Sequence, residues 1–363
     1  MVGPAMDQAA IRRAVLTHRA LLWGVCYRMS GCQADADDIV QDVIERALRS
    51  PPDDTERDPK PWLLRVAINA SRDHLRRRKR LVYPGTWLPG PAEVTQGALA
   101  TVTGPDVRYG ELESATVAFL AALEALSATQ RAVLILRDVL GYSSRETAEA
   151  LSLSEANART THHRARAAMV DYDAARVELS AARLQRHRTA LRALILHLST
   201  GNIDALQALL SEDARARNDS DDEQFAARRV VRGRDKVMLF HIKTNALHAR
   251  RAAESPRFAL RVLNGEPALV ASWPCSDPRV PGRMVVRIAL DAAGHICVID
   301  TIVATRKLVG IDFTALPPRP ALRELARSIR ASMIQPKLRS WAPAAAARAA
   351  RALSWRIAAW LRP

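Results

Sequence analysis

WLLRVAINASRDHLRRRKR, residues 62–80, is the stretch that decides how the first part of this chain folds. It contains no Gly or Pro, is rich in strong helix formers, and repeats its apolar residues every three or four positions, which predicts one helix. One side is apolar or small and should face a core: Leu63, Leu64, Ala67, Ala70, Ser71 and Leu75. The other side is a cationic stripe with one amide: Arg65, Asn69, Arg72, Arg76 and Lys79, with Arg80 close by. Taken alone, the stripe fits a solvated face and a polyanion site equally well.

The composition indicates a globular chain with a polyanionic partner. Its 363 residues are enough for two or three domains, and 48% of them are hydrophobic. The net charge of +16 and the pI near 10.7 favour nucleic acid or an acidic membrane surface as partner. From Thr314 onward, however, ten basic residues stand against Glu324 alone, so much of that charge lies at one end.

The four cysteines predict no metal site and no cofactor. Cys26, Cys32, Cys275 and Cys297 form no CxxC pair and have no His partners at metal-ligand spacing. The N-terminus lacks the apolar core of a signal peptide, and no apolar run reaches the ~18 residues that a bilayer requires. We therefore expect a cytoplasmic protein with structural free thiols.

The residues before the 62–80 helix predict two more helices and a loop. Residues 11–29 have a helical pattern that Gly31 breaks, and ADADDIVQDVIERAL (34–48) begins with acids that suit the positive end of a helix dipole. The outer side of this second helix is acidic: Asp38, Gln41, Asp42 and Glu45, with Asp35 at its start. SPPDDTERDPKP (50–61) has four prolines and should be a loop.

Residues 111–173 are also helical in pattern and contain a helix-turn-helix layout. Ser143 and Glu146 form a capping box for a short helix, and Ser154 caps a longer one after a turn at 152–154. The second helix should turn Ala158, His162, Ala165 and Met169 inward. Its outer face can reach base edges and phosphates: Asn157, Thr160, Thr161, His163 and Arg164. The alternative is a helical hairpin that binds nothing.

The rest of the chain predicts an α+β domain and a basic tail. After helices at 186–198 and 204–210 come segments of strand character: RRVVRG (228–233), FALRVL (258–263), ALVASW (268–273), RMVVRIAL (283–290) and HICVIDTIVAT (295–305). The Ala/Arg-rich tail, 314–363, carries Trp341, Trp355 and Trp360. Three roles fit this tail: an anionic membrane surface, non-specific DNA binding, or a partly disordered solubilising segment.

Three stretches in this order resemble a bacterial sigma factor of the extracytoplasmic-function (ECF) group: YRMSGCQADADDIVQDVIERAL, DPKPWLLRVAINASRDHLRRRKR, and ALEALSATQRAVLILRDVLGYSSRETAEALSLSEANARTTHHRARAAM. YPGTWLPGP (83–91) followed by an α+β domain resembles the subgroup with a fused SnoaL-like domain. The resemblance divides the chain into two all-α sigma domains at 10–82 and 113–175, a flexible linker at 83–112, a cone-shaped α+β SnoaL-like domain at 184–313 and a basic helical tail at 314–363.

The resemblance implies a sigma factor that binds core RNA polymerase and directs it to promoters. It assigns Asp35, Asp38, Gln41, Asp42 and Glu45 to the β′ coiled coil of the polymerase, whose β flap is a further expected contact. It assigns backbone contacts at the −10 element to Arg65, Asn69, Arg72, Arg76 and Lys79, and a pocket for an unstacked base to the loop around Arg57, Asp58 and Lys60. It assigns the −35 element to the helix-turn-helix residues Asn157, Thr160, Thr161, His163 and Arg164.

Two departures from the family pattern qualify this interpretation. His162 stands at a core-facing position that is usually aliphatic, so we expect local looseness there. NDSDDEQFAARR (218–229) replaces a glycine-rich, Asp-led motif, and the Asn-Pro-Asp motif is absent near 305–308, which puts the family's regulation in doubt here.

The SnoaL-like fold also hosts cyclases and isomerases that use Asp/His pairs. Asp219, Asp222, His241, His248 and His295 are available, but their spacing does not force them together. We expect a ligand-sensing or intramolecular docking role and no enzymatic activity. The alternatives are a SnoaL-like enzyme fused to a DNA-binding segment and a simple helix-turn-helix regulator. A simple regulator would have no use for the acidic helix or the strand-opening loop.

Overall fold

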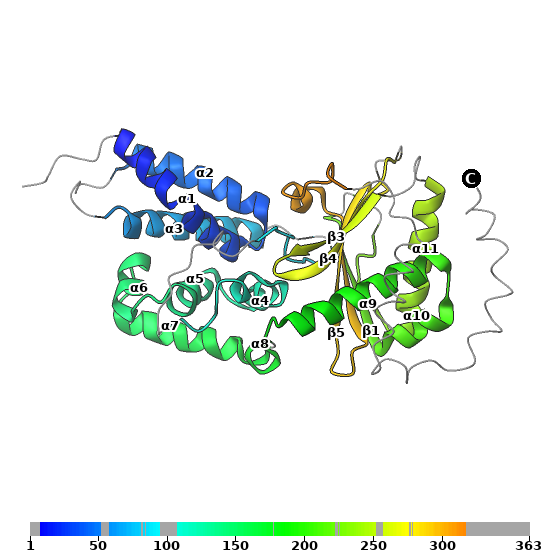
Figure 1. Ribbon diagram of the computed structural model, residues 1–363. Coiled ribbons are helices and arrows are strands. Elements are labelled where there is room, and N and C mark those ends of the chain that lie inside the picture. Colours follow the sequence, from blue (N-terminus) through cyan, green and yellow to red (C-terminus); the bar gives the residue numbers. More distant parts are fainter. Residues whose placement is uncertain are drawn as a thin grey trace, which may run out of the picture. The chain divides into compact units, whose positions relative to one another are not determined.

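A computed structural model forms two compact units (Figure 1). It describes residues 8–51, 58–80, 83, 85–94, 107–176, 178–221, 224, 226–251, 257–275, 277 and 279–316, without the side chains of 246–251. The helical unit comprises Met1–Val82, Pro89–Glu178 and Leu263–Gly265, and the sheet unit comprises Tyr83–Leu88, Leu179–Val262 and Glu266–Pro363. The tail at 317–363 lies outside the described residues, so its predicted roles stay predictions.

The helical unit begins with three long helices: α1 (Gln8–Ser30), α2 (Gln33–Arg49) and α3 (Lys60–Arg80). Gly31 separates α1 from α2 with a φ of 72°, a left-handed conformation that glycine adopts without strain. The helix expected at 62–80 is confirmed as α3, which begins two residues earlier. Each residue expected to face the core from α3 is buried: Leu63, Leu64, Ala67, Ala70, Ser71 and Leu75.

The second half of the helical unit consists of shorter helices: η1 (Glu113–Ala115), α4 (Val117–Ala122), η2 (Leu123–Ala125), α5 (Ala128–Leu134), the π-helical turn η3 (Ile135–Val139), α6 (Ser144–Leu151), α7 (Glu155–Ala168) and α8 (Val170–Ala175). The capping box of Ser143 and Glu146 at the start of α6 is confirmed. Ser152, with a φ of 54°, ends α6, and Ser154 caps α7, so the helix-turn-helix has the expected bounds.

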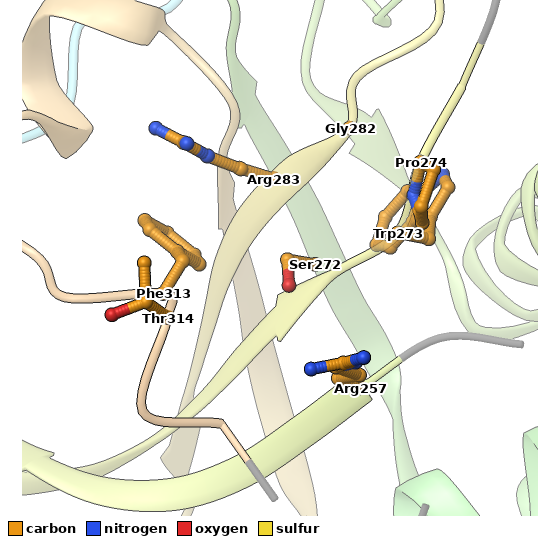
Figure 2. Close-up of a pocket in the computed structure, with 8 residues that line it drawn as sticks. All are labelled: Arg257, Ser272, Trp273, Pro274, Gly282, Arg283, Phe313 and Thr314. Carbon is orange, nitrogen blue, oxygen red and sulfur yellow. The ribbon is translucent and has the colours of Figure 1, made fainter. Parts of the chain in front are cut away.

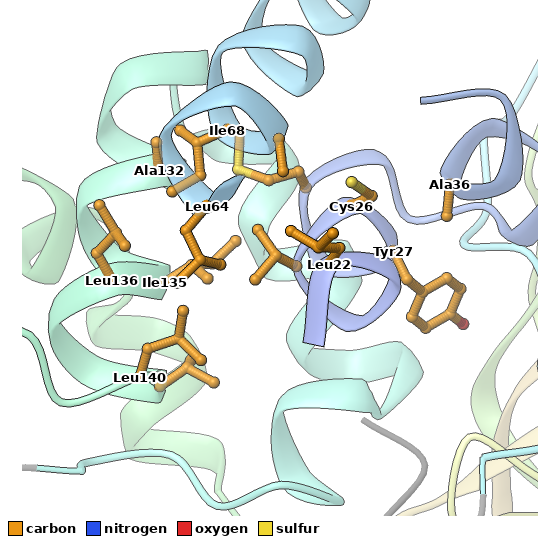
Figure 3. Close-up of a cluster of buried hydrophobic side chains, with 14 of the residues drawn as sticks. Leu22, Cys26, Tyr27, Ala36, Leu64, Ile68, Ala132, Ile135, Leu136 and Leu140 are labelled. Atoms are coloured by element: carbon orange, nitrogen blue, oxygen red, sulfur yellow. The ribbon is translucent and has the colours of Figure 1, made fainter. Parts of the chain in front are cut away.

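The two halves of the helical unit share one hydrophobic core. Leu64 and Ile68 of α3 lie in the same buried cluster as Ala132, Ile135 and Leu136 (Figure 3). Of the segment predicted as a flexible linker, residues 88–92 are buried, and the described part of 83–112 is divided between the two units. The domain boundaries read from the sequence remain predictions.

The sheet unit is an α+β fold around a six-stranded sheet of order β2-β1-β6-β5-β4-β3. Its elements are α9 (Ala181–Thr200), α10 (Ile203–Leu209), β1 (Leu210–Asp219), β2 (Val231–Arg232), α11 (Arg234–Arg251), β3 (Arg257–Leu263), β4 (Glu266–Ser272), β5 (Arg283–Leu290), β6 (Ile296–Ile302) and η4 (Thr305–Leu308). β1 pairs with β6 in parallel, whereas β1–β2, β4–β5 and β5–β6 are antiparallel. β1 was not expected from the sequence.

One face of this sheet packs against helices. Leu191 and Leu194 of α9 lie in one buried cluster with Leu269, Val286 and Ile288 of β4 and β5. Since side chains alternate along a strand, residues such as Ser272 and Arg283 belong to the opposite face. No helix among the described residues is long and apolar enough to cross a membrane.

Candidate functional site

The acidic face of α2 is exposed at three of its four positions. Asp38, Gln41 and Glu45 are exposed, and Asp42 is half-buried, 3.7 Å from the Arg77 guanidinium of α3. Asp35 is only 9% exposed, and its carboxylate lies 3.4 Å from Nε2 of His74. Residue 35 lies one turn before buried Ile39 and therefore faces α3. Asp35 thus supports the packing of α2 on α3 and does not belong to the exposed acidic face.

The cationic stripe of α3 is exposed along most of its length. Arg65, Arg76 and Lys79 are exposed, whereas Asn69 and Arg72 are half-buried. The Arg72 guanidinium donates to Asn69 Oδ1 at 3.3 Å and to Thr129 Oγ1 at 3.2 Å. Burial, together with the charge of Arg76, lowers the pKa of Arg72. Arg72 is thus positioned by protein partners, and the other three cations remain accessible.

A hollow of about 340 Å³ lies where the end of α2 meets the start of α3. It is lined by Arg46, Arg49, Ser50, Trp62, Val66 and Asn69. The sequence had placed a base pocket at Arg57, Asp58 and Lys60. Arg57 lies outside the described residues, and Asp58 Oδ1 accepts the backbone N–H of Lys60 at 3.0 Å, which helps to begin α3. The described hollow therefore lies beside Trp62, a residue that the sequence reasoning did not select.

The outer face of α7 presents the polar residues expected from the helix-turn-helix. Asn157, Thr160, His163 and Arg164 are exposed and Thr161 is half-buried. The Thr161 hydroxyl donates to Asn157 Oδ1 at 3.1 Å, which leaves the Asn157 amide N–H groups directed to other acceptors. The face can thus offer amide, hydroxyl, imidazole and guanidinium groups to a DNA groove.

A buried carboxylate supports the inner side of α7. Asp138 is 1% exposed; Nε2 of His162 lies 2.9 Å from it, and Arg166 donates to both of its oxygens at 3.1 and 2.6 Å. Burial opposes ionisation of Asp138, but the hydrogen bonds from His162 and Arg166 outweigh it and lower the pKa of the carboxyl. The looseness expected at His162 is therefore wrong, because Asp138 holds this imidazole in place.

An arginine clasp, formed by Arg78, Glu124 and Arg131, ties the two halves of the helical unit together. Arg131 is 2% exposed and donates to the carbonyls of Met29 and Leu123 at 2.7 and 2.6 Å. Its guanidinium also lies 2.8 Å from Glu124, which accepts two bonds from Arg78 at 2.8 and 2.6 Å. The helix with the cationic stripe is thus fastened to η2 and α5.

In the sheet unit, Lys307 and Asp219 form a buried ion pair, here called the lysine node, that contacts the segment at 83–88. Lys307, 5% exposed, donates to Asp219 at 2.6 Å and to the carbonyl of Leu88 at 2.7 Å. Its ammonium lies 4.8 Å from the ring centroid of Tyr83 and 4.4 Å from that of Trp87. Asp219 also accepts the Tyr83 hydroxyl and the Leu88 N–H. The sequence had noted only what is missing near 305–308, whereas Lys307 is present there and makes these contacts.

The Asp and His residues considered for catalysis have different surroundings. Asp219 belongs to the lysine node, and His295 Nδ1 lies 3.5 Å from Asp291. His241 of α11 is half-buried with its Nε2 atom enclosed, and this burial lowers its pKa to about 4. Asp222 and the side chain of His248 lie outside the described residues.

Comparison with known proteins identifies the family. Residues 14–81 match the model for sigma-70 region 2, and residues 116–169 match sigma-70 region 4. The chain is 34% identical over 228 residues to the ECF RNA polymerase sigma factor SigJ of Mycobacterium tuberculosis, a match that covers 61% of this chain and 69% of SigJ. The chain belongs to the ECF sigma factors. SigG of the same organism is 29% identical over 307 residues, 78% of each chain.

A solved structure agrees with this assignment. The crystal structure of M. tuberculosis SigJ aligns with a TM-score of 0.57 and 27% identity, over 81% of this chain and 96% of that chain. This sigma factor therefore has the expected architecture, in which two helical sigma regions are followed by an α+β SnoaL-like part. It directs RNA polymerase to promoters for transcription initiation, with core polymerase and promoter DNA as partners. α2 and α3 lie in region 2, and α6 and α7 in region 4.

Proposed function

We propose that this sigma factor divides its work among three surfaces of the helical unit. The acidic face of α2, with Asp38, Gln41, Asp42 and Glu45, binds the β′ coiled coil of core polymerase, and region 4 meets the β flap. The cationic stripe of α3 binds the backbone of the −10 element. The outer face of α7 reads the −35 element through Asn157, Thr160, Thr161, His163 and Arg164. Their exposure and charge support these roles.

The hollow beside Trp62 is the site that binds an unstacked base when the DNA strands open. A base that leaves the duplex needs an apolar or aromatic surface to replace its stacking, and each such contact is worth about 1–3 kcal/mol. Trp62 offers that surface, Asn69 offers an amide for a base edge, and Arg46 and Arg49 offer cations for the neighbouring phosphates. The hollow also borders the cationic stripe, which shares Asn69. The captured base therefore lies here, and Asp58 acts mainly at the start of α3.

The sheet unit regulates the helical unit and has no enzymatic activity in this proposal. The lysine node grips the segment at 83–88, which connects region 2 to region 4 along the chain. A ligand or a charge change that loosens this grip would alter the freedom of the connection. The different surroundings of Asp219, His241 and His295 favour such a docking role over acid–base catalysis. Since its partners are polymerase and promoter DNA, we expect the protein to act in the cytoplasm.

Run-off transcription with purified core polymerase tests the proposal. The wild-type chain should give promoter-dependent transcripts, and Trp62→Ala should lose open complexes, detected by permanganate at unpaired thymines, while still binding core polymerase. Arg12→Ala, on the exposed side of α1, is the control and should open promoters normally. Normal promoter opening by Trp62→Ala would show that this hollow does not bind the unstacked base.

Lys307→Met should change the amount of transcription without changing the promoter sequence preferred; unchanged transcription would argue against regulation through the lysine node.

A further inference from the structure

A second hollow, of about 310 Å³, lies on the sheet face opposite α9 (Figure 2). It is lined by Arg257, Ser272, Trp273, Arg283, Phe313 and Thr314, among others. Ser272 is the cross-strand neighbour of Arg283, and Arg257 begins β3, the strand on the other side of β4. The two arginines therefore stand on the strands that flank Ser272, with Phe313 closing one side and Trp273 the other.

The charge of this hollow is not balanced by the described protein. Neither the Arg257 nor the Arg283 side chain has an ion pair or a hydrogen bond with any of the described residues; the guanidinium carbon of Arg283 lies 5.3 Å from the ring centroid of Phe313. Asp277 pairs with Arg279, and the Asp312 carboxylate accepts the N–H and hydroxyl of Thr314 and is under the charge of Arg261. Arg257 and Ser272 line one part of this space, and the Arg283 guanidinium lies at its Phe313 side.

The shape and chemistry of the lining define what would fit. Guanidinium groups bind carboxylate and phosphate oxygens through paired hydrogen bonds, and they also stack on flat rings. Trp273 is 5% exposed and Phe313 6% exposed, so both provide rigid apolar walls. The volume lies at the lower end of that of small-molecule pockets, which span about 300–1,000 Å³. The lining residues that the structure describes include no acid, histidine or cysteine, so they are suited to binding.

We propose that the hollow between Arg257, Arg283 and Phe313 binds a small anion carried on a flat ring, namely an aromatic carboxylate or an aryl phosphate. The anionic group binds the Arg257 guanidinium and accepts a hydrogen bond from the Ser272 hydroxyl, while the ring packs against Phe313 and Trp273 beside the Arg283 guanidinium. A nucleic-acid backbone fits less well, because it needs a longer track of cations than two arginines.

Ligand-observed NMR on the full chain tests this site without polymerase or DNA, so its result is independent of promoter activity. The probes are benzoate and phenyl phosphate, with benzamide as the neutral analogue and inorganic phosphate as the anion without a ring. At least one ring-bearing anion should bind, and binding should be about tenfold weaker for benzamide and for inorganic phosphate. Equal binding of benzamide, or no binding of either ring-bearing anion at millimolar concentration, would overturn the proposal.

Matched variants locate the binding. Arg257→Gln with Arg283→Gln should weaken probe binding at least about tenfold, whereas Arg279→Gln, which removes a cation already paired with Asp277, should leave it unchanged. Arg283→Lys keeps the charge but loses the flat stacking group, and should give an intermediate value. Equal affinity in the double variant would place the probe elsewhere. Displacement of phenyl phosphate can also be compared between benzoate and a single-stranded oligonucleotide. If the oligonucleotide acts at a lower concentration than benzoate, the hollow binds nucleic acid and the small-ligand proposal is wrong.

Discussion

Mild acid should destabilise the sheet unit selectively, through two histidines whose Nε2 atoms are buried. His187 of α9 is 2% exposed, and its Nε2 has no hydrogen-bond partner among the described residues. Burial, with Arg183 and Arg186 nearby, lowers the pKa of His187 to about 4. His241 of α11 also has an unpartnered Nε2 in the described structure, and burial lowers its pKa to about 4. Both imidazoles therefore fold in the neutral form.

The sign and size of the effect follow from the difference between folded and unfolded pKa values. Between pH 6.5 and about 4 the unfolded chain binds more protons at these sites than the folded chain. Above pH 6.5 both histidines are neutral in the folded and the unfolded chain, so they cost no stability there. The free energy of unfolding falls as the pH drops from 6.5 toward 4. At pH 5, 1.5 units below the unfolded value, each histidine should cost about 2 kcal/mol. Glu266, whose pKa burial raises, works in the opposite direction.

Hydrogen exchange on the full chain measures this effect in each unit separately. Between pH 7.5 and pH 5, after correction for intrinsic exchange rates, α9 and α11 should lose more protection than α1–α3. His187→Leu should remove part of the excess loss, because Leu cannot be protonated and fills a similar space, while His241 and His197, whose pKa burial also lowers, retain the rest. His163→Leu, on the exposed face of α7, is the control for the substitution itself. Equal acid sensitivity in His187→Leu and the wild-type chain would refute the assignment, whatever Glu266 contributes.

Three further predictions concern the helical unit. Arg76→Ala with Lys79→Ala should weaken promoter binding at every sequence and reduce the slope of log affinity against log salt by about 2, because these side chains act on phosphates. Asn157→Ala or Arg164→Ala should instead change the preferred bases within the −35 element, measured by binding to a library of sites. Glu124→Gln should reduce the free energy of unfolding of the helical unit by about 3 kcal/mol in denaturant titrations, because it leaves buried cations without their counter-charge.

Two of these predictions have a matched control variant, and the −35 prediction has an outcome that would contradict it. Arg12→Ala with Arg13→Ala removes the same charge from an exposed part of α1 and should leave the salt slope nearly unchanged. If Asn157→Ala or Arg164→Ala weakened binding equally at all DNA sequences, these side chains would contact the DNA backbone and not the bases. Glu149→Gln breaks a surface pair with Arg145 and should cost less than about 1 kcal/mol; a similar cost for Glu124→Gln would mean that the clasp adds little.

The helices could be predicted from the sequence because their signals are local. The apolar repeat of α3 and the capping box at Ser143 depend only on neighbouring residues, and both are confirmed. β1 was missed because LSEDARARND lacks the β-branched and aromatic residues typical of strands. Its inward positions are small, Ala214 and Ala216, and they are buried only because the rest of the sheet unit covers them.

The supporting contacts of the site could not be predicted, because they join residues far apart in the sequence. Exposure of Arg76 or Asn157 follows from helical periodicity, whereas Arg131 reaches a carbonyl 102 residues away and Lys307 one 219 residues away. Asp35 was assigned to polymerase binding through the family resemblance; only the position of α3 shows that its side chain turns inward. Sequence pattern therefore predicts the exposed faces of the helices, and the structure adds the long-range contacts that position these helices.

The common core of the helical unit has a consequence for how this part of the protein can be assembled. Because α3 and α5 contribute to one buried cluster and the arginine clasp adds polar bonds between their halves, continuity of the chain between residues 94 and 107 is not what holds them together. Two polypeptides separated there, 1–94 and 107–363, should associate when they are co-expressed and reconstitute the helical unit. Sigma regions 2 and 4 would then behave as complementing fragments, and a split reporter fused at the break would record when they part.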